Sequence, residues 1–256
     1  MTALLDIHSL SVGIAGKQVC QALSLQIKAG ESWAILGMNG VGKTTLLHTL
    51  AGLRAAQHGE ILLDGSNLQQ LSRRDIAMKL GLLLQDSEDA FPGTVMQTAL
   101  CGRHPHMKSW QWESQTDLEI AQQALSFVGM QTFAERSILS LSGGERRRVA
   151  IATLLCQQTP LMLLDEPTNH LDLRFQHLIL SGLIDLLKQQ QRATLMIMHD
   201  VNLAIRYCDH ALLLFNDGNH LAGRCDEIMN SENLSKLYDY PMKCINDNGE
   251  TVYLPT

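Results

Sequence analysis

Residues 37–45 combine glycines, a lysine and threonines in a pattern that suits the binding of phosphate. The run begins at Gly37 and reaches Lys43 and Thr44 with the spacing G-x-x-x-x-G-K-[ST], the pattern of a P-loop. In such a loop backbone N–H groups and a helix N-terminus surround the phosphates, the lysine adds a positive charge, and the threonine hydroxyl ligates Mg²⁺. The phosphate-binding residues that this pattern predicts are Gly37, Met38, Asn39, Gly40, Val41, Gly42, Lys43, Thr44 and Thr45.

Asp165 and Glu166 form a second group of side chains that can do chemistry. They follow 161–164, an apolar run typical of a buried parallel strand, and so stand where that strand ends. An aspartate there can complete a Mg²⁺ shell, and a glutamate beside it can accept a proton from an attacking water. Because such a pair is also typical of a solvated strand end, it is the P-loop that favours the catalytic interpretation.

The spacing of apolar residues predicts the elements that position these groups. Strand patterns occupy 4–12, 19–27 and 33–36, and the third runs into the P-loop, after which a helix begins at Lys43. Strands that alternate with helices further along imply a parallel sheet with helices on its faces. Further strands are predicted at 59–63, 80–84, 161–164, 193–198 and 211–215, and helices at 173–189, 202–207, 226–229 and 232–238.

Composition and charge exclude several classes of protein. The net charge of −6 gives no overall basic field for nucleic acid or an anionic membrane. The six cysteines show no C-x-x-C spacing, so neither a zinc knuckle nor a disulfide framework is indicated. The apolar runs are far shorter than the roughly 20 residues of a spanning helix. Asp6 interrupts the first apolar stretch and no basic region precedes it, so we expect a cytoplasmic protein without a secretory signal.

The run Leu-Ser-Gly-Gly-Glu at 141–145 is the most specific pattern, because average residue usage produces it by chance in on the order of one such chain in two thousand. It opens a predicted helix, whose N-terminal N–H groups and positive dipole end suit a phosphate. A helix cap with two glycines in a turn is the alternative interpretation. Together with the P-loop, Gln85 and His199, each after an apolar strand, the run resembles the nucleotide-binding subunit of ABC transporters over nearly the whole chain.

This resemblance implies ATP and Mg²⁺ as ligands and a role for each matching residue. Glu166, His199 and Gln85 would be catalytic: the general base, the switch histidine and the Q-loop glutamine. Mg²⁺ would be held by Thr44, Gln85 and Asp165, and Asp172 would belong to the D-loop, which reaches across a dimer. The signature residues that would contact the partner's ATP are Leu141, Ser142, Gly143, Gly144 and Glu145.

The expected fold class is α/β, with a P-loop NTPase core around a largely parallel sheet, an N-terminal antiparallel β subdomain and an inserted α-helical subdomain. A chain of 256 residues suffices for one such nucleotide-binding domain. We expect residues 1–85 and 159–256 to form the RecA-like and β core, and residues 86–158 to form the helical subdomain that carries the signature.

The resemblance also implies partners: a head-to-tail homodimer that sandwiches two ATP, integral membrane permease subunits, and a substrate-binding protein acting through the permease. No nucleic acid is expected, and the chain would lie peripherally on the cytoplasmic face of the inner membrane. A soluble ABC ATPase of metal-cluster assembly or DNA repair is the alternative, which a large accessory insertion or a nucleic-acid patch would favour. Neither is evident in the sequence, although Arg103 and 146–148 could make a small basic area. A P-loop kinase would leave 141–145 unexplained and would phosphorylate an acceptor instead of releasing phosphate.

Two further segments concern specificity. Ile14 stands where relatives commonly place an aromatic residue that stacks on adenine, so we expect GTP to substitute for ATP more readily than in relatives with the aromatic residue.

The segments 91–95, 102–106, 226–229 and 232–234 resemble the importers of iron-siderophore, haem and cobalamin, with cobalamin or siderophore preferred. Phe91 and Val95 in 86–106 would anchor a membrane partner's helix, although the acidic run at 86–89 is equally typical of a solvated loop. His104 and His106 lack a third metal ligand and are expected to be surface or docking residues.

Overall fold

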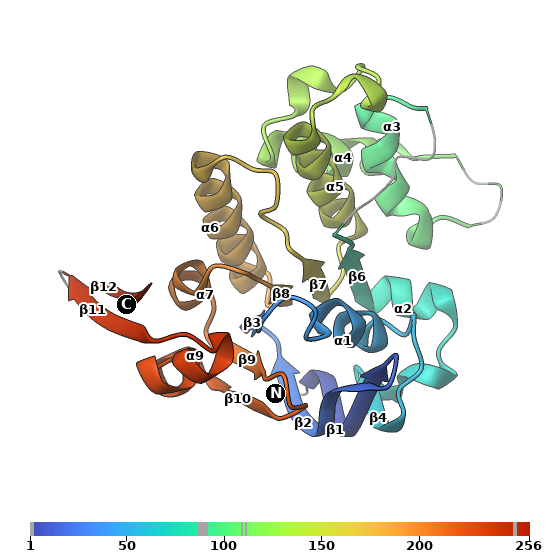
Figure 1. The fold of residues 1–256 in the computed structure, drawn as a ribbon. Helices are drawn as coiled ribbons and strands as arrows, with labels where there is room; N and C mark the ends of the chain where they lie inside the picture. The colour runs from blue at the N-terminus through green and yellow to red at the C-terminus, as the bar shows by residue number, and fades with distance from the viewer. Residues whose placement is uncertain (1–2, 86–91, 109, 111, 248–249) are drawn as a thin grey trace. The chain divides into compact units, whose positions relative to one another are not determined.

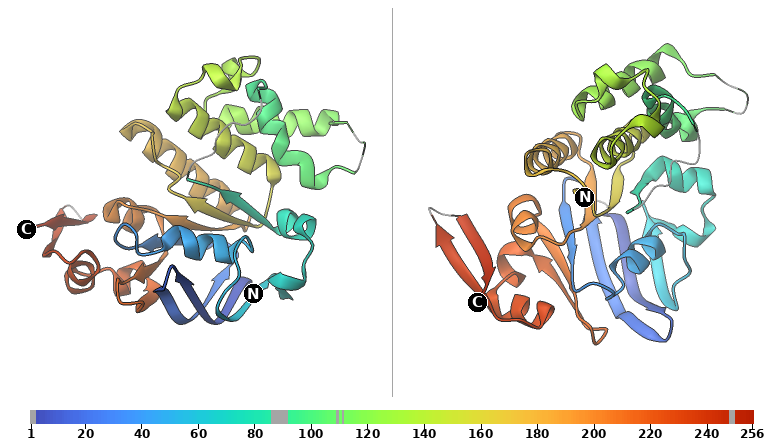
Figure 2. Two further views of the ribbon diagram at one scale, coloured as in Figure 1. Left: turned by 45° about the vertical axis from the view of Figure 1, so that its right-hand side comes forward. Right: turned by 45° about the horizontal axis from the view of Figure 1, so that its top comes forward.

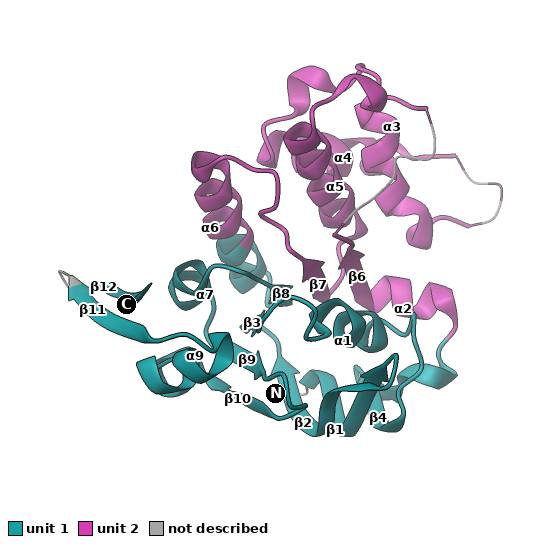
Figure 3. Cartoon of the chain, in the orientation of Figure 1, with its two compact units in different colours: residues 1–71, 184–256 teal, residues 72–183 magenta. Residues whose placement is uncertain are grey.

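The computed structural model describes residues 3–85, 92–108, 110, 112–247 and 250–256 (Figure 1). The chain forms two compact units, which Figure 3 shows in different colours: unit 1 contains residues 1–71 and 184–256, and unit 2 contains residues 72–183. The helix α6 (Leu173–Gln189) carries the chain from unit 2 into unit 1. No helix within the described ranges is both long and apolar enough to cross a membrane.

Unit 1 begins with an antiparallel sheet in the order β2-β1-β4-β5. A turn at Ala15 and Gly16, both with positive φ, joins its first two strands. Leu5, Ile7 and Leu10 are almost fully buried, so this face of the sheet forms part of the core. The strands are β1 (Ala3–Ile14), β2 (Lys17–Lys28), β4 (His58–Leu63) and β5 (Ser66–Asn67), and a short 3₁₀ helix follows at Leu68–Gln70.

The second group of strands in unit 1 is mostly parallel. β3 pairs in parallel with both β8 and β9, and β10 pairs antiparallel with β9. Every residue of β3 and β8 is buried, as expected for parallel strands that are covered on both faces. Figure 2 shows that the helix α1 (Lys43–Leu50), which follows β3, lies against β1 and β2. The strands are β3 (Ser32–Leu36), β8 (Ala193–Ile197), β9 (His210–Leu214) and β10 (His220–Arg224).

The side-chain amide of Asn202 connects the C-terminal part of unit 1 to α7. Asn202, in the first turn of α7, donates from Nδ2 to the carbonyl of Tyr253 at 3.1 Å and accepts from its backbone N–H at 2.8 Å. This pair of hydrogen bonds imitates the pairing of a neighbouring strand and holds β12 against α7. The elements are α7 (Val201–Tyr207), α8 (Cys225–Ile228), α9 (Ser231–Tyr238), β11 (Met242–Asp247) and β12 (Glu250–Pro255).

Unit 2 combines two parallel strands with a group of packed helices. β6 and β7 pair in parallel, and α3, α4 and α5 pack against one another (Figure 2). The elements are α2 (Arg73–Lys79), β6 (Leu80–Leu83), α3 (Val95–Leu100), α4 (Gln115–Phe127), α5 (Gly143–Gln157) and β7 (Leu161–Asp165). Short 3₁₀ helices lie at Cys101–His106, Gln131–Phe133 and Ile138–Ser140.

A buried ion pair joins three helical elements of unit 2. Arg103 Nε lies 2.8 Å from Asp117 Oδ1, and both side chains are about one-tenth exposed or less. The same guanidinium donates to the carbonyl of Cys156 at 2.8 Å, which ties Cys101–His106 and α4 to the end of α5. The side-chain hydroxyl of Ser114 and the Arg103 guanidinium lower the pKa of Asp117 to about 2.

The observed elements confirm most of the predicted ones. The helix α6 covers 173–189 as expected, and the predicted strands coincide with β1 to β4 and β6 to β9 within one or two residues at each end. The helix α2 was not predicted, because of its seven residues Ile76 alone is a buried apolar residue. The expected helical subdomain at 86–158 remains a prediction, since the two units divide the chain at other positions.

Candidate functional site

The P-loop of unit 1 connects β3 to α1 in a conformation that requires glycine. Gly40 and Gly42 have φ values of 74° and 107°, and a Cβ on Gly42 would lie 2.4 Å from Val19 Cγ2. Lys43 is 6% exposed, and its Nζ donates to the carbonyls of Gly37 at 2.8 Å and Met38 at 3.1 Å. The loop thus folds around its own lysine and leads directly into the N-terminus of α1.

The beginning of α1 is electrostatically suited to an anion. Its N-cap is Gly42, which contributes no side-chain hydrogen bond, and its first turn contains no acidic residue. The first N–H groups of a helix have no intrahelical acceptor, and the macrodipole places partial positive charge there. Thr44 and Thr45 lie in this first turn and are partly exposed. These residues fit a polyphosphate.

His199 follows the strand next to the one that leads into the P-loop. Ile35 of β3 lies opposite Ile197 of β8 in parallel register, so the two strands end at the same edge. His199 is exposed there, and the next residue, Asp200, caps α7 by accepting from the N–H groups of Asn202 at 2.7 Å and Leu203 at 3.2 Å. Unit 1 therefore places the histidine at the same edge as the P-loop.

Unit 2 brings two polar side chains, Gln85 and Asn169, together on Glu166. Glu166 is 9% exposed and has a φ of 48°, in the left-handed region. Gln85 Nε2 donates to Glu166 Oε2 at 3.2 Å, and the side-chain amide of Asn169 also donates to this carboxylate oxygen. Asp165, the last residue of β7, is fully buried. The sequence did not predict the role of Asn169, because a residue three positions away reaches the carboxylate only through the turn after β7.

The signature run forms the beginning of α5 as expected. Ser142 is the N-cap: its hydroxyl accepts from Glu145 N–H at 3.3 Å, while the Glu145 carboxylate accepts from the Ser142 N–H at 2.7 Å. The backbone N–H and the hydroxyl of Ser142 both donate to the Glu145 carboxylate, which lowers the pKa of Glu145. The N–H groups of Gly143 and Gly144 remain without intrahelical acceptors. A helix end of this kind suits a phosphate, although its own cap supplies part of its hydrogen bonding.

The two glycines of the signature have different surroundings. A Cβ on Gly144 would lie 2.8 Å from the backbone carbonyl of His170, whereas a Cβ on Gly143 would meet nothing within 4 Å. Gly144 therefore allows 169–172 to approach α5 closely. Asp172 at the end of this segment caps α6, because its Oδ1 accepts from Phe175 N–H at 2.9 Å.

The small basic area that would favour a soluble ABC ATPase has two of its arginines buried. Arg103 is buried against Asp117, and Arg147 is 5% exposed with its guanidinium on backbone carbonyls. Arg148 lies over the ring of Phe175, with 4.3 Å between its Cζ and the ring centroid. Burial removes Arg103 and Arg147 from the surface that a nucleic acid would contact.

The expected docking segment is described only in part. Phe91 and the acidic run at 86–89 lie outside the described residues. Val95, the other expected anchor, is fully buried in α3, so the expectation that it contacts a partner was wrong. His106 contacts the carbonyl of Gln157 through Nε2 at 2.8 Å. The described residues contain no group of three or more histidine, cysteine, aspartate or glutamate side chains suited to a metal ion.

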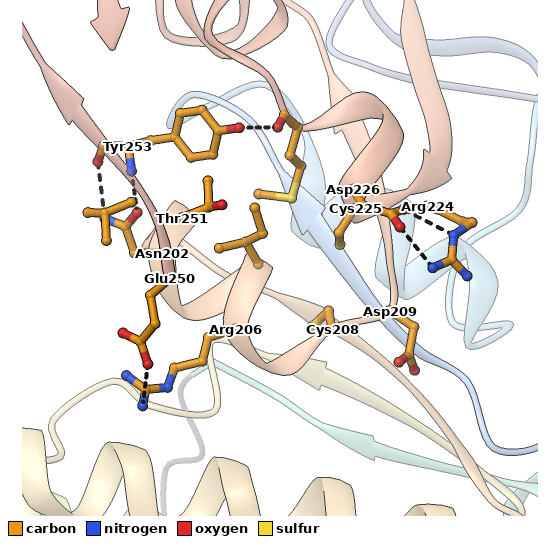
Figure 4. A pocket seen from close by; sticks show the side chains of 13 residues that line it. Asn202, Arg206, Cys208, Asp209, Arg224, Cys225, Asp226, Glu250, Thr251 and Tyr253 are labelled. Carbon is orange, nitrogen blue, oxygen red and sulfur yellow. Dashed lines mark hydrogen bonds and ion pairs between the residues drawn. The ribbon is translucent and has the colours of Figure 1, made fainter. Parts of the chain in front are cut away.

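Unit 1 also contains a cavity of about 590 Å³ beside α7, α8 and β12 (Figure 4). Arg206 and Arg224 at its lining form ion pairs with Glu250 at 3.5 Å and Asp226 at 2.9 Å. Its buried thiols include Cys225, whose pKa burial raises to about 12. None of the described residues that line this cavity belongs to the P-loop, so it is a separate feature.

Comparison with known proteins agrees with this geometry. The family profile described as ABC transporter matches residues 20–169. The chain is 35% identical over 241 residues to the ferric enterobactin transport ATP-binding protein of Escherichia coli, which covers 94% of this chain and 89% of that protein. It is 38% identical over 240 residues to the hemin import ATP-binding protein of Pseudomonas aeruginosa, which covers 92% of each.

A solved structure extends the agreement to the fold. A protein assigned to the metal-chelate type of ABC transporter, in an inward-facing conformation, matches with a TM-score of 0.86 at 30% identity, covering 100% of this chain and 98% of the other. The α/β fold class expected from the sequence is thereby confirmed. Since the family profile spans more than half of the residues and the relatives align almost end to end, the chain belongs to the ABC transporter family as an ATP-binding, ATP-hydrolysing subunit.

Proposed function

We propose that this ATPase drives an importer for iron-siderophore, haem or cobalamin, by ATP-dependent closure of a homodimer. The names of the similar proteins support the class of cargo, since one transports ferric enterobactin and another imports hemin. The importer's permease subunits would anchor the chain peripherally at the cytoplasmic face of the membrane. A substrate-binding protein would deliver the cargo to that permease.

Each unit, taken by itself, contains residues that would serve ATP hydrolysis. In unit 1, residues 37–45 would bind the phosphates, and His199 would donate to the γ-phosphate. In unit 2, Glu166 would accept a proton from the attacking water. Asp165, Gln85 and Thr44 offer the hard oxygen ligands that Mg²⁺ prefers, and the buried carboxylate of Asp165 fits such an ion. Bound Mg²⁺ would neutralise phosphate charge.

The observation that most directly supports a dimer is the N-terminus of α5 at Ser142 and Gly143. Each chain contains one P-loop, yet it presents a second helix N-terminus with glycine N–H groups and open space at Gly143. A head-to-tail dimer uses this second end for the γ-phosphate of the partner's ATP. ATP that bridges two chains binds only the closed form, so it shifts the equilibrium toward closure, and hydrolysis reverses this shift.

The test is uptake by proteoliposomes that contain the chain with its copurified permease. Labelled iron-siderophore, haem and cobalamin are offered outside together with the binding protein, and ATP is enclosed. We expect one cargo to accumulate with the wild type and none with Lys43→Ala, which removes the charge that holds the β- and γ-phosphates. ATP hydrolysis that needs no permease and increases with DNA ends or a metal-cluster scaffold would favour the soluble alternative.

A further inference from the structure

Arg147 lies in α5, two residues after the signature run, with its guanidinium inside unit 2. The side chain is buried, since the residue is 5% exposed. Its Nη1 donates to the carbonyls of Leu84 at 2.5 Å and Gln85 at 3.3 Å. Its Nη2 donates to the carbonyls of Asp165 and of Glu166, the latter at 2.7 Å. One side chain therefore contacts the two segments that carry the Q-loop glutamine and the general base.

We propose that Arg147 is a positioning residue for ATP hydrolysis, which holds the backbones of Gln85 and Glu166 at the separation that their side-chain contact requires. This role concerns the ATPase activity of the family and does not depend on the cargo or on import. Arg147 touches backbone carbonyls in this role and does not act on the reacting atoms directly.

The Arg147 guanidinium connects the two segments just beyond the last paired residues of β6 and β7. β6 and β7 pair in parallel up to Leu83 opposite Leu164. Beyond this pair the two strands no longer hydrogen-bond to each other, so the buried carbonyls that follow need other donors. The planar guanidinium supplies donors on two nitrogens with a fixed spacing, one directed at each segment. It therefore continues the connection between the strand ends over the next two residues of each segment, 84–85 and 165–166.

Because the Arg147 guanidinium is buried, its hydrogen bonds hold the two segments at one separation. A buried charge is costly unless it is well hydrogen-bonded, and hydrogen bonds to a charged donor are stronger than those between neutral groups. A change in the separation of the strand ends would break two or more of these bonds together. The position of Glu166, which also has the left-handed φ of 48°, is thereby coupled to that of Gln85.

The consequence for catalysis concerns the orientation of the Glu166 carboxylate. Its Oε2 accepts from Gln85 Nε2 at 3.2 Å, a hydrogen bond that a small backbone shift would lose. A misplacement of about 1 Å can reduce turnover on the order of 100-fold. The hydrogen bonds of Arg147 described above go to carbonyls of residues 84, 85, 165 and 166, so the phosphate affinity of the P-loop is expected to depend little on it.

The test compares Arg147→Gln and Arg147→Lys with the matched control Arg148→Gln. Arg148 is the next residue of the same helix, and its Nη1 donates to the carbonyl of Val128 at 3.2 Å, away from both catalytic segments. We expect kcat to fall on the order of 100-fold in Arg147→Gln, with KM for ATP within about twofold of the wild type. Arg148→Gln should keep the wild-type kcat. Unchanged kcat in Arg147→Gln, or an equal loss in Arg148→Gln, would overturn the proposal.

Arg147→Lys tests whether kcat depends on the planar guanidinium or only on its positive charge. It also replaces Arg147→Gln if that variant does not fold. A lysine ammonium keeps the charge but presents its donors from a single atom, so it cannot span both segments as the guanidinium does. We expect kcat to remain at least tenfold below the wild type while ATP binding persists. Wild-type kcat in Arg147→Lys would show that the planar fork is not required and would overturn the proposal.

A double-mutant cycle separates positioning from a general loss of stability. Gln85→Ala removes the side chain that Arg147 is proposed to hold against Glu166. If Arg147 acts through this contact, adding Arg147→Gln to Gln85→Ala should reduce kcat by less than about threefold more. If the two losses in kcat simply multiply, Arg147 acts elsewhere and the proposed role is wrong.

Discussion

Gln85 and Glu166 are 81 positions apart in the chain, and Nε2 of the first lies 3.2 Å from Oε2 of the second. The relationship follows from the parallel pairing of β6 with β7, which aligns Leu83 with Leu164. Each side chain stands two residues beyond its aligned leucine. A glutamine and a carboxylate that meet in this way can orient one water molecule between a proton acceptor and a phosphate.

Replacement of this carboxylate should separate binding from hydrolysis. In Glu166→Gln the amide keeps nearly the same shape but cannot accept the proton, so hydrolysis should fall at least 100-fold while ATP still binds. The measurements are phosphate release and the mass of the purified chain with Mg-ATP. We expect a stable ATP-dependent dimer in the mutant. Hydrolysis at the wild-type rate would mean that another group is the base.

The two glycines of the signature should respond differently to the same substitution. Gly144→Ala places a Cβ 2.8 Å from the carbonyl of His170, so it should destabilise the chain by about 1–3 kcal/mol as an overpacked contact. Gly143→Ala meets open space and is the matched control, which should leave stability equal or slightly raised. Urea unfolding of the ATP-free chains provides the comparison. Equal destabilisation of both variants would contradict the close approach to His170.

Because Asp117 and Arg103 form a buried pair, the free energy of unfolding should fall as the pH is lowered. The pKa of Asp117 is lowered from 3.8 to about 2 by Ser114 and Arg103, so its stabilisation is complete above the unfolded value and is lost as the pH falls toward 2. The full difference is about 2 kcal/mol, of which about 1 kcal/mol is lost by pH 3. Urea unfolding from pH 6 to pH 3 measures it, and Asp117→Asn should lack this part of the slope.

A surface pair provides the control for that experiment. Arg224 and Asp226 lie 2.9 Å apart but are more than half exposed, so Asp226→Asn should leave the unfolding free energy nearly unchanged. At pH 7, Asp117→Asn should cost about 3–5 kcal/mol, because Arg103 is left buried without its partner. A small effect at pH 7 would show that the pair contributes little.

The exposed side chain at the end of β1 should influence the choice of nucleotide. Ile14 is 38% exposed and offers no aromatic face for a base. We expect the wild type to bind GTP nearly as well as ATP. Ile14→Tyr should strengthen ATP binding by about 1 kcal/mol, roughly fivefold, through stacking. Titration with both nucleotides tests this, and a strong ATP preference in the wild type would contradict it.

The elements around the P-loop and the signature could be predicted from the sequence because the patterns are local. Glycines before Lys43 predict a turn into a helix, and the run at 141–145 predicts the opening of a second helix, and the structure confirms both. The strand ends that carry Gln85 and Asp165 were also predictable, because a short apolar run followed by polar residues is typical of a parallel strand.

The contacts between distant segments could not be predicted from these patterns. Arg147 lies in a run of three arginines, which is typical of an exposed helical face, yet its burial depends on carbonyls some 20 and 60 residues away. The same holds for Arg103, whose partner Asp117 is on another helix. A basic residue is buried at low cost only where tertiary structure supplies hydrogen-bond acceptors, and the sequence does not display those acceptors.

The hydrogen bonds between Asn202 and Tyr253 make the C-terminal hairpin a convenient reporter. Asn202 lies in the first turn of α7, three residues after His199, so a movement of the histidine during turnover would be transmitted to β12 and its partner β11. Cys244 on β11 is exposed and accepts a thiol-reactive fluorophore, provided that the other exposed thiol, Cys101, is replaced by serine. Such a label would follow the nucleotide cycle optically from a position outside the motifs that bind and hydrolyse ATP.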